Sequence, residues 1–211
     1  MGYLITLEGG EGSGKTSILK MMADILGQRG HQIVCTREPG GIEIAEQIRR
    51  VILDRDNSSM DPRTEALLYA AARRQHLVEK VIPALEAGKV VLCDRYIDSS
   101  LAYQGHARGL GIEEIYTINK FAINDYMPDL TLYFDVEPHV GLARIEKDAG
   151  REVNRLDVES MKFHKAVREG YQILVGQYPD RIQVIDAGNS IEKVLEDALA
   201  VVAGFMGSRQ N

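Results

Sequence analysis

Short apolar runs alternate with longer stretches of helical periodicity along the whole chain. Five runs have the length and composition of buried strands, and they cover residues 3–7, 32–36, 90–93, 130–134 and 181–185. Between the first two runs, apolar residues recur every three or four positions over 18–26, which predicts an amphipathic helix. Strands that alternate with helices form parallel βαβ units. The pattern therefore predicts an α/β fold with a five-stranded parallel sheet flanked by helices.

Periodicity and capping signals place the other helices. A helix is expected over 44–53, and its inner face should carry four apolar residues: Ile44, Ile48, Val51 and Ile52. Asp61 followed by Pro62 predicts the start of a long helix, which Pro83 should kink or end. Further helices are predicted over 112–125, 138–148, 158–177 and 190–205.

The composition suits one soluble domain. The chain has 211 residues, 45% of them hydrophobic, enough for a single core over residues 1–211. No run approaches the roughly 18 apolar residues that span a bilayer, and the first residues lack the features of a secretion signal. Cys35 and Cys93 belong to no CxxC pair and are expected to be reduced core thiols of a cytoplasmic protein. The net charge of −6 argues against a nucleic-acid partner.

A glycine-rich segment follows the first predicted strand and fits the pattern GxxxxGK[ST]: Gly9, Gly10, Glu11, Gly12, Ser13, Gly14, Lys15 and Thr16. Glycines let backbone N–H groups curl round phosphate oxygens without a Cβ in the way, and the next helix adds the positive end of its dipole. Lys15 is expected to reach the β- and γ-phosphates, and the Thr16 hydroxyl to bind Mg²⁺. The segment predicts an ATP site in a three-layer P-loop NTPase fold.

The third predicted strand, 90–93, ends at Asp94, and Arg95 follows at once. In P-loop proteins an aspartate at this place holds Mg²⁺ directly or through water. Ligands of open α/β sheets bind at the carboxyl ends of the strands. Asp94 is therefore a second candidate for the metal site, beside a guanidinium that suits phosphate.

A phosphate loop alone does not identify an activity, because GTPase switches, motor ATPases and small-molecule kinases share it. A GTPase would need NKxD to read guanine. The closest segment, NKFA at 119–122, has alanine in place of the aspartate. The guanine-reading class is therefore excluded, while kinases and ATP-operated switches remain.

Three further segments resemble thymidylate kinases: TREPGG at 36–41, AARRQH at 71–76, and DRY at 94–96, which leads into SSLAYQG at 99–105. The resemblance extends through nearly the whole chain. Deoxynucleoside kinases typically carry Glu-Arg-Ser at the place of DRY, and this difference favours a monophosphate acceptor. The resemblance implies ATP-dependent phosphorylation of dTMP to dTDP in dTTP synthesis, and a homodimer.

The acceptor is already an anion, so catalysis must overcome the repulsion between two nucleotides, and arginine planes suit phosphate oxygens. The resemblance implies that Arg95 and Arg37 hold the acceptor phosphate and that Arg49 helps to bind the nucleotide. Glu38 would face the acceptor sugar and the water shell of Mg²⁺. Lys15, Glu38, Asp94 and Arg95 are thus the expected catalytic residues, whereas His76 is expected to be structural.

The same resemblance assigns the base pocket. Arg73 would contact O4 of thymine, and Ser100 and Gln104 would form hydrogen bonds around the base. Tyr69 would stack on the ring, at a position where the family usually has phenylalanine. Tyr103 would pack beneath C2′ and exclude a ribose hydroxyl.

A polar, basic segment around Gly150 is similar to the lid of the family, approximately residues 144–156. The phosphate loop contains no arginine, so the lid must supply the cation that some relatives carry in the loop. Arg144 is expected to contact ATP. Arg151 is the first candidate for the catalytic lid arginine and Arg155 the second.

Two alternatives stay open. A kinase for guanylate, adenylate or cytidylate would share the phosphate loop but prefer another acceptor. An ATP-operated switch would hydrolyse ATP without any phosphoryl acceptor. A substrate panel, assayed with and without dTMP, distinguishes the three.

Overall fold

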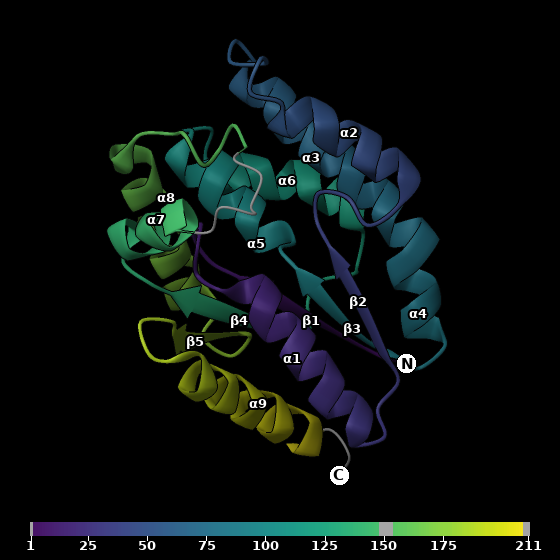
Figure 1. Cartoon of the computed structure of the whole chain (residues 1–211). Coiled ribbons are helices and arrows are strands. Elements are labelled where there is room, and N and C mark those ends of the chain that lie inside the picture. The colour runs from purple at the N-terminus through teal and green to yellow at the C-terminus, as the bar shows by residue number, and fades with distance from the viewer. Residues whose placement is uncertain (1, 148–153, 209–211) are drawn as a thin grey trace.

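The computed structural model describes residues 2–147 and 154–208. All five predicted strands are present and form one parallel sheet in the order β2-β3-β1-β4-β5 (Figure 1). The strands are β1 (Tyr3–Glu8), β2 (Ile33–Arg37), β3 (Val90–Asp94), β4 (Leu130–Asp135) and β5 (Ile182–Asp186). The predicted α/β class and the five-stranded parallel sheet are confirmed.

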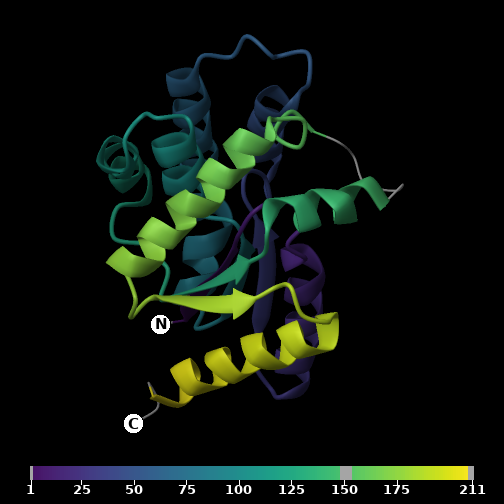
Figure 2. The ribbon, with the colours of Figure 1, turned by 90° about the vertical axis from the view of Figure 1, so that its left-hand side faces the viewer.

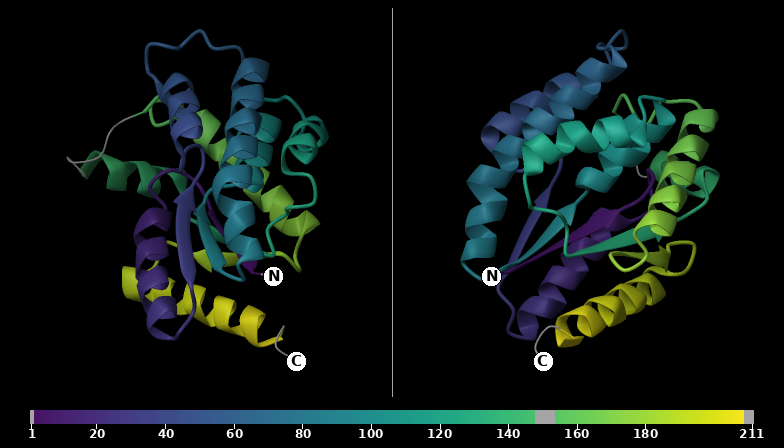
Figure 3. Two further views of the ribbon diagram at one scale, coloured as in Figure 1. Left: turned by 90° about the vertical axis from the view of Figure 1, so that its right-hand side faces the viewer. Right: turned by 180° about the vertical axis from the view of Figure 1, so that it is seen from behind.

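Helices cover both faces of the sheet. They are α1 (Lys15–Gln28), α2 (Glu43–Leu53), α3 (Pro62–His76), α4 (Ile82–Glu86), α5 (Ile97–Ser100), α6 (Ile112–Ile123), α7 (Pro138–Lys147), α8 (Met161–Gln177) and α9 (Ile191–Ser208), with π-helical segments η1 (Leu77–Val81) and η2 (Leu101–Ala107). Side chains of α1 and α9 pack against one face, whereas α3–α6, η2 and α8 contribute to the core on the other. Figures 2 and 3 show the sheet between these two layers.

Strand alternation explains the two cores. On β1, Leu4 belongs to the core beneath α3–α6 and α8, while Ile5 and Leu7 belong to the core beneath α1 and α9. Successive side chains of a strand point to opposite faces. A strand that is buried on both faces therefore reads as a continuous apolar run, which is how the sequence revealed it.

Parallel register brings the ends of three strands together. Asp94 on β3 lies opposite Leu7 on β1 and Arg37 on β2. The backbone N–H of Glu38 donates to the Asp94 carbonyl, 2.9 Å away. The segments that follow β1, β2 and β3 consequently meet at one edge of the sheet.

The chain was expected to kink or end at Pro83. It stays helical there, but a π-helical segment, η1, replaces the regular α-helix directly before the proline and leads into α4. Two other expectations about the elements were wrong. Residues 97–107 form helices that the sequence analysis did not predict. Ile44 and Val51 are exposed on α2, where Ala45 and Ile52 are the buried residues.

Cys35 is likewise exposed, so only Cys93 is a core thiol, and both cysteines are free. In the described part of the chain no helix combines the length and apolar character needed to cross a bilayer.

Candidate active site

A cleft of about 1290 Å³ opens at the carboxyl ends of β1, β2 and β3. It is lined by residues from the phosphate loop, from the segments after β2 and β3, and from α2, α3 and α7. Among them are these predicted site residues: Glu11, Gly12, Ser13, Gly14, Lys15, Thr16, Arg37, Glu38, Arg49, Tyr69, Arg73, Asp94, Arg95, Ser100, Tyr103, Gln104 and Arg144. The structure thus brings the expected ATP and acceptor residues to one cavity.

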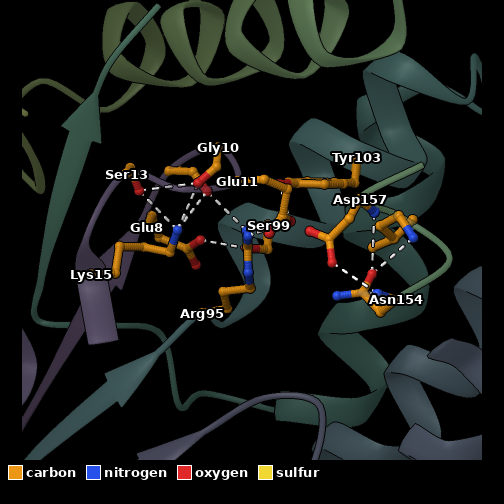
Figure 4. A network of polar contacts seen from close by, with 12 residues as sticks. Glu8, Gly10, Glu11, Ser13, Lys15, Arg95, Ser99, Tyr103, Asn154 and Asp157 are labelled. Atoms are coloured by element: carbon orange, nitrogen blue, oxygen red, sulfur yellow. Dashed lines mark hydrogen bonds and ion pairs between the residues drawn. The ribbon is translucent and has the colours of Figure 1, made fainter. Parts of the chain in front are cut away.

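The phosphate loop connects β1 to α1. Gly12 and Gly14 have φ of 69° and 85°, in the left-handed region that favours glycine. Lys15 folds back into the loop, where its Nζ donates to the Gly9 and Gly10 carbonyls at 3.0 and 2.9 Å (Figure 4). Burial, together with the charge of Arg95, lowers the pKa of Lys15 to about 8. The loop and the start of α1 form a cradle suited to phosphate.

The two candidate metal ligands lie in contact. The Thr16 hydroxyl donates to Asp94 Oδ2 at 2.5 Å, across the start of α1 and the end of β3. A hydroxyl and a carboxylate are oxygen ligands of the kind that Mg²⁺ prefers, and Mg²⁺ commonly takes one or two protein oxygens together with phosphates and water. This pair therefore fits a magnesium ion beside the phosphate loop.

Arg95 is held at the mouth of the phosphate loop. Its φ of 69° is unusual for a residue with a side chain, and its N–H bonds to the Leu7 carbonyl at 3.0 Å. The guanidinium donates to the Gly9 carbonyl at 2.9 Å and to Glu11 Oε1 at 2.6 Å. Tyr103 also donates to Glu11 Oε1, at 3.0 Å. Glu11 thus joins the loop to the acceptor side of the cleft.

Glu8, which no sequence motif marked, is a buried residue that fixes the segment after Arg95. The buried carboxylate accepts hydrogen bonds from the Tyr96 N–H, from Ser99 and from Tyr171. Burial and the charge of Asp98 raise the pKa of Glu8 to about 7. An acidic residue at the end of an apolar strand was the available signal for it.

Glu38 is fixed by two basic side chains. Its Oε2 accepts from Arg73 Nε at 2.7 Å, and its Oε1 bonds to His76 Nδ1 at 2.8 Å. His76 Nε2 bonds to the Thr36 hydroxyl at 2.6 Å. His76 therefore lies in direct contact with a predicted site residue, and it orients that carboxylate.

The base-pocket residues are buried beside the cleft. Tyr69, Tyr103, Ser100 and Gln104 each expose 9% of their surface or less. Arg73 donates to Ser100 at 3.1 Å and to the Tyr96 carbonyl at 2.9 Å. These contacts leave the side chains in fixed orientations.

Arg37 and Arg49 lie at the rim on the side of α2. Arg37 is half exposed and pairs with Glu46 at 2.8 Å. Arg49 donates to the Pro39 carbonyl at 3.0 Å. Both guanidinium groups are available to an anion that enters the cleft.

The expected lid is only partly described. Arg144 on α7 is exposed and lines the cleft, and Arg151 lies outside the described residues. The expectation for Arg155 requires a correction. Its guanidinium is buried, where it donates to Glu65 Oε2 at 2.5 Å and to the Ile52 carbonyl at 2.9 Å, and the residue does not line the cleft. A carboxylate on α3, which no sequence motif marks, draws this arginine into the protein.

The helix α7 rests directly on the phosphate loop. A Cβ at Gly12 would lie 2.0 Å from the Gly141 carbonyl oxygen, and one at Gly141 would lie 2.2 Å from that of Glu11. Only glycine at both positions permits this backbone contact. The helix that leads to the expected lid is therefore seated against the ATP loop.

Known proteins resemble this chain over nearly its whole length. The family model described as thymidylate kinase matches residues 7–198. Thymidylate kinases of Clostridium novyi and Anoxybacillus flavithermus are each 62% identical, over 97% and 96% of this chain and 98% and 97% of their own length. The crystal structure of thymidylate kinase from Ehrlichia chaffeensis is similar with a TM-score of 0.78 and 31% identity, over 96% of this chain and 98% of that one. The chain belongs to the thymidylate kinase family.

Proposed function

We propose that the protein transfers the γ-phosphoryl group of ATP to dTMP and so produces dTDP for dTTP synthesis. The observation that carries this proposal is the position of Arg95, which joins the phosphate loop at Gly9 and Glu11 from the acceptor side of the same cleft. An arginine there can hold the acceptor phosphate in line with ATP. The two anions are then brought together by positioning and charge neutralisation, without a general base.

ATP would lie with its phosphates on the loop. Lys15, freed from the loop carbonyls, would bind the β- and γ-phosphates, and the N-terminus of α1 would add backbone donors. Mg²⁺ would be held by Thr16 and Asp94, where it would neutralise phosphate charge. Arg144 on α7 would contact the ATP phosphates from the lid side.

The acceptor would lie deeper in the cleft. Its phosphate would meet Arg95, Arg37 and Arg49, while Glu38 would face the sugar. Tyr103 would lie beneath C2′, so a ribose hydroxyl would have no room.

The base would occupy the pocket between α3 and η2. Tyr69 would stack on thymine, and Arg73 would face O4. Ser100 and Gln104 would complete the hydrogen bonds around the ring. Because one methyl group contributes only about 1 kcal/mol in an apolar pocket, some activity with dUMP is expected.

The lid would supply the remaining cation through Arg151. Closure over both substrates would exclude water from the transferring phosphoryl group. Arg151→Ala should lower kcat by roughly tenfold or more and change the affinity for dTMP little. An unchanged kcat would remove this residue from the mechanism.

A cytoplasmic homodimer is the proposed form of the enzyme. Five exposed apolar side chains lie on the connected elements α2, α3, η1 and α6, and we call them the α2/α3/α6 patch: Ile44, Val51, Leu67, Val78 and Phe121. Phe121 is 92% exposed, which is unusual for phenylalanine in a lone chain. A second copy of the chain would bury this patch.

The purified protein with ATP and Mg²⁺ should convert dTMP to dTDP, and dTMP should raise its melting temperature more than other nucleoside monophosphates do. ATP hydrolysis without phosphorylation of dTMP would favour the ATP-operated switch instead. Preferred phosphorylation of dGMP, dAMP or dCMP would favour a kinase for another base.

A further inference from the structure

Glu65 on α3 is a buried carboxylate whose partners come from two other segments, η2 with its C-cap and the segment before α8. It is 1% exposed. Its Oε1 accepts from Gln104 Nε2 at 2.8 Å and from Arg108 Nε at 3.3 Å, and its Oε2 accepts from Arg155 at 2.5 Å and from Arg108 Nη2 at 3.3 Å. Burial alone would raise the pKa of Glu65, but the Arg108 charge and the hydrogen bonds of Gln104 and Arg155 lower it by more. The group is therefore an ionised carboxylate, which can only accept hydrogen bonds.

An acceptor of this kind fixes the amide of Gln104. Only the NH₂ group of the amide can face Glu65, so Gln104 Oε1 must point away from it. In the described part of the chain Gln104 Oε1 has no hydrogen-bond partner. Among the described residues, however, His164 Nε2 is the one fully buried side-chain nitrogen or oxygen atom that lacks a partner. Gln104 Oε1 is therefore not fully buried, and the cleft is the open space that this residue lines.

We propose that Glu65 is a specificity-determining residue. It fixes the orientation of the Gln104 amide, so that the amide oxygen offers a hydrogen-bond acceptor to the base of the bound nucleoside monophosphate. The proposal rests on the proposed function, because it concerns how that pocket chooses its pyrimidine. Thymine and uracil carry a donor, N3–H, in the middle of their Watson–Crick edge. Cytosine carries an acceptor at N3, which would leave Gln104 Oε1 unpaired. Glu65 thereby excludes dCMP without touching it.

The Glu65→Gln variant reverses this polarity. Arg108 donates to both oxygens of Glu65 at 3.3 Å, so the short contact of Arg155 with Oε2 decides the orientation. The new amide oxygen would stay at the Oε2 position, and the NH₂ would face Gln104. Gln104 would then turn its oxygen toward residue 65 and its NH₂ toward the base. We expect the ratio of kcat/KM for dTMP to that for dCMP to fall by roughly tenfold or more, since a pocket with a wrongly placed donor loses its hydrogen-bond discrimination. The ratio of dTMP to dUMP should not change, because both bases present N3–H.

A double substitution restores the polarity with no change in charge. In Glu65→Gln/Gln104→Glu the amide of residue 65 donates to the new carboxylate, whose other oxygen faces the base as an acceptor. The two arginines retain one negative charge beside them. The dTMP to dCMP ratio should return toward that of the wild type, and it can be read on this variant alone if Glu65→Gln does not fold.

Glu159→Gln is the matched control. Glu159 pairs with the same Arg108 at 2.6 Å but does not contact Gln104, so the dTMP to dCMP ratio should stay at the wild-type value. A ratio of two substrates is independent of the amount of folded enzyme. An unchanged ratio in Glu65→Gln, an equal fall in Glu159→Gln, or no recovery in the double variant would each overturn the role of Glu65. Absence of dTMP phosphorylation by the wild type would instead refute the proposed function.

Discussion

At the residue scale, the site depends on charged groups that are held by the backbone and by buried partners. Arg95 has a left-handed backbone conformation and donates to a carbonyl of the phosphate loop. Glu8 accepts a hydrogen bond from the backbone N–H of Tyr96, the residue after Arg95, and so fixes the turn that carries Arg95. A guanidinium held in this way loses little freedom when it meets a phosphate, which is the basis of electrostatic preorganisation.

Substituting Arg95 tests whether its guanidinium binds the acceptor phosphate. Arg95→Lys keeps the charge but removes the planar, bidentate donor set. The kcat/KM for dTMP should fall by roughly 10²-fold, with a smaller change in KM for ATP. Steady-state kinetics with each substrate varied in turn measures both. Arg63→Lys, on the exposed start of α3, should behave as the wild type. A wild-type kcat/KM in Arg95→Lys would contradict the assignment of Arg95 to the acceptor phosphate.

Glu8 predicts a pH dependence of stability. Its pKa is raised from an ordinary value of 4.5 to about 7, so between these values the folded state binds a proton that the unfolded state has released. Stability from this group is therefore present below pH 4.5 and is lost as pH rises to 7. Relative to the wild type, Glu8→Gln should gain free energy of unfolding across this range, on the order of a few kcal/mol.

Urea unfolding at several pH values measures this difference. Glu86→Gln, at an exposed position on α4, should show a difference from the wild type that is flat with pH. The same flat difference in Glu8→Gln would mean that Glu8 is not protonated in the folded protein near pH 6.

At the element scale, the backbone of α7 packs directly against the phosphate loop. Gly12 and Gly141 allow the two backbones to approach more closely than any side chain would permit. The helix also carries Arg144, where the expected lid begins. If the loop moves when ATP binds, α7 would therefore be displaced with it.

Gly141→Ala tests this contact. The new Cβ would meet the Glu11 carbonyl at 2.2 Å and displace α7 from the loop. We expect kcat/KM for ATP to fall by roughly tenfold or more, because a misplacement of about 1 Å is costly in an enzyme site. Thermal stabilisation by dTMP alone should persist. Gly27→Ala on α1, where a Cβ meets nothing within 4 Å, is the control and should keep its activity. Normal ATP kinetics in Gly141→Ala would refute the coupling.

At the scale of the whole molecule, exposed apolar side chains gather on elements that are in contact with one another, α2, α3, η1 and α6. Two helices that carry the α2/α3/α6 patch, α2 and α3, also line the acceptor side of the cleft through Arg49, Tyr69 and Arg73. Burial of the patch by a second copy would support those helices. The site and the assembly would then depend on the same elements.

Phe121→Glu tests the assembly. A charge in place of a 92% exposed phenylalanine at a dimer interface should shift the protein to monomers, as sedimentation velocity would show. Ile191→Glu, at a partly exposed apolar position on α9, should leave the dimer intact. A wild-type protein that is already monomeric, or a Phe121→Glu variant that stays dimeric, would contradict the proposed interface.

The sequence by itself determined the parallel sheet, the phosphate loop and the place of Asp94 and Arg95 at a strand end. These features follow from local patterns, because apolar runs mark buried strands and parallel strands bring their carboxyl ends to one edge. The family segments added the acceptor residues. The sequence did not determine which apolar side chains of α2 remain exposed, because a face packed in the core and a face at an interface have the same periodicity.

Only the tertiary structure decided which buried charges are paired. Glu65, Gln104 and Arg155 lie far apart in the sequence, and nothing near any of them indicates the others. Arg155 looked like a lid arginine because it follows a basic segment, yet a buried carboxylate holds it elsewhere. The same is true of Glu8 with Tyr171 and of Glu38 with His76. A buried charge must find a partner, and which one it finds depends on how distant elements pack.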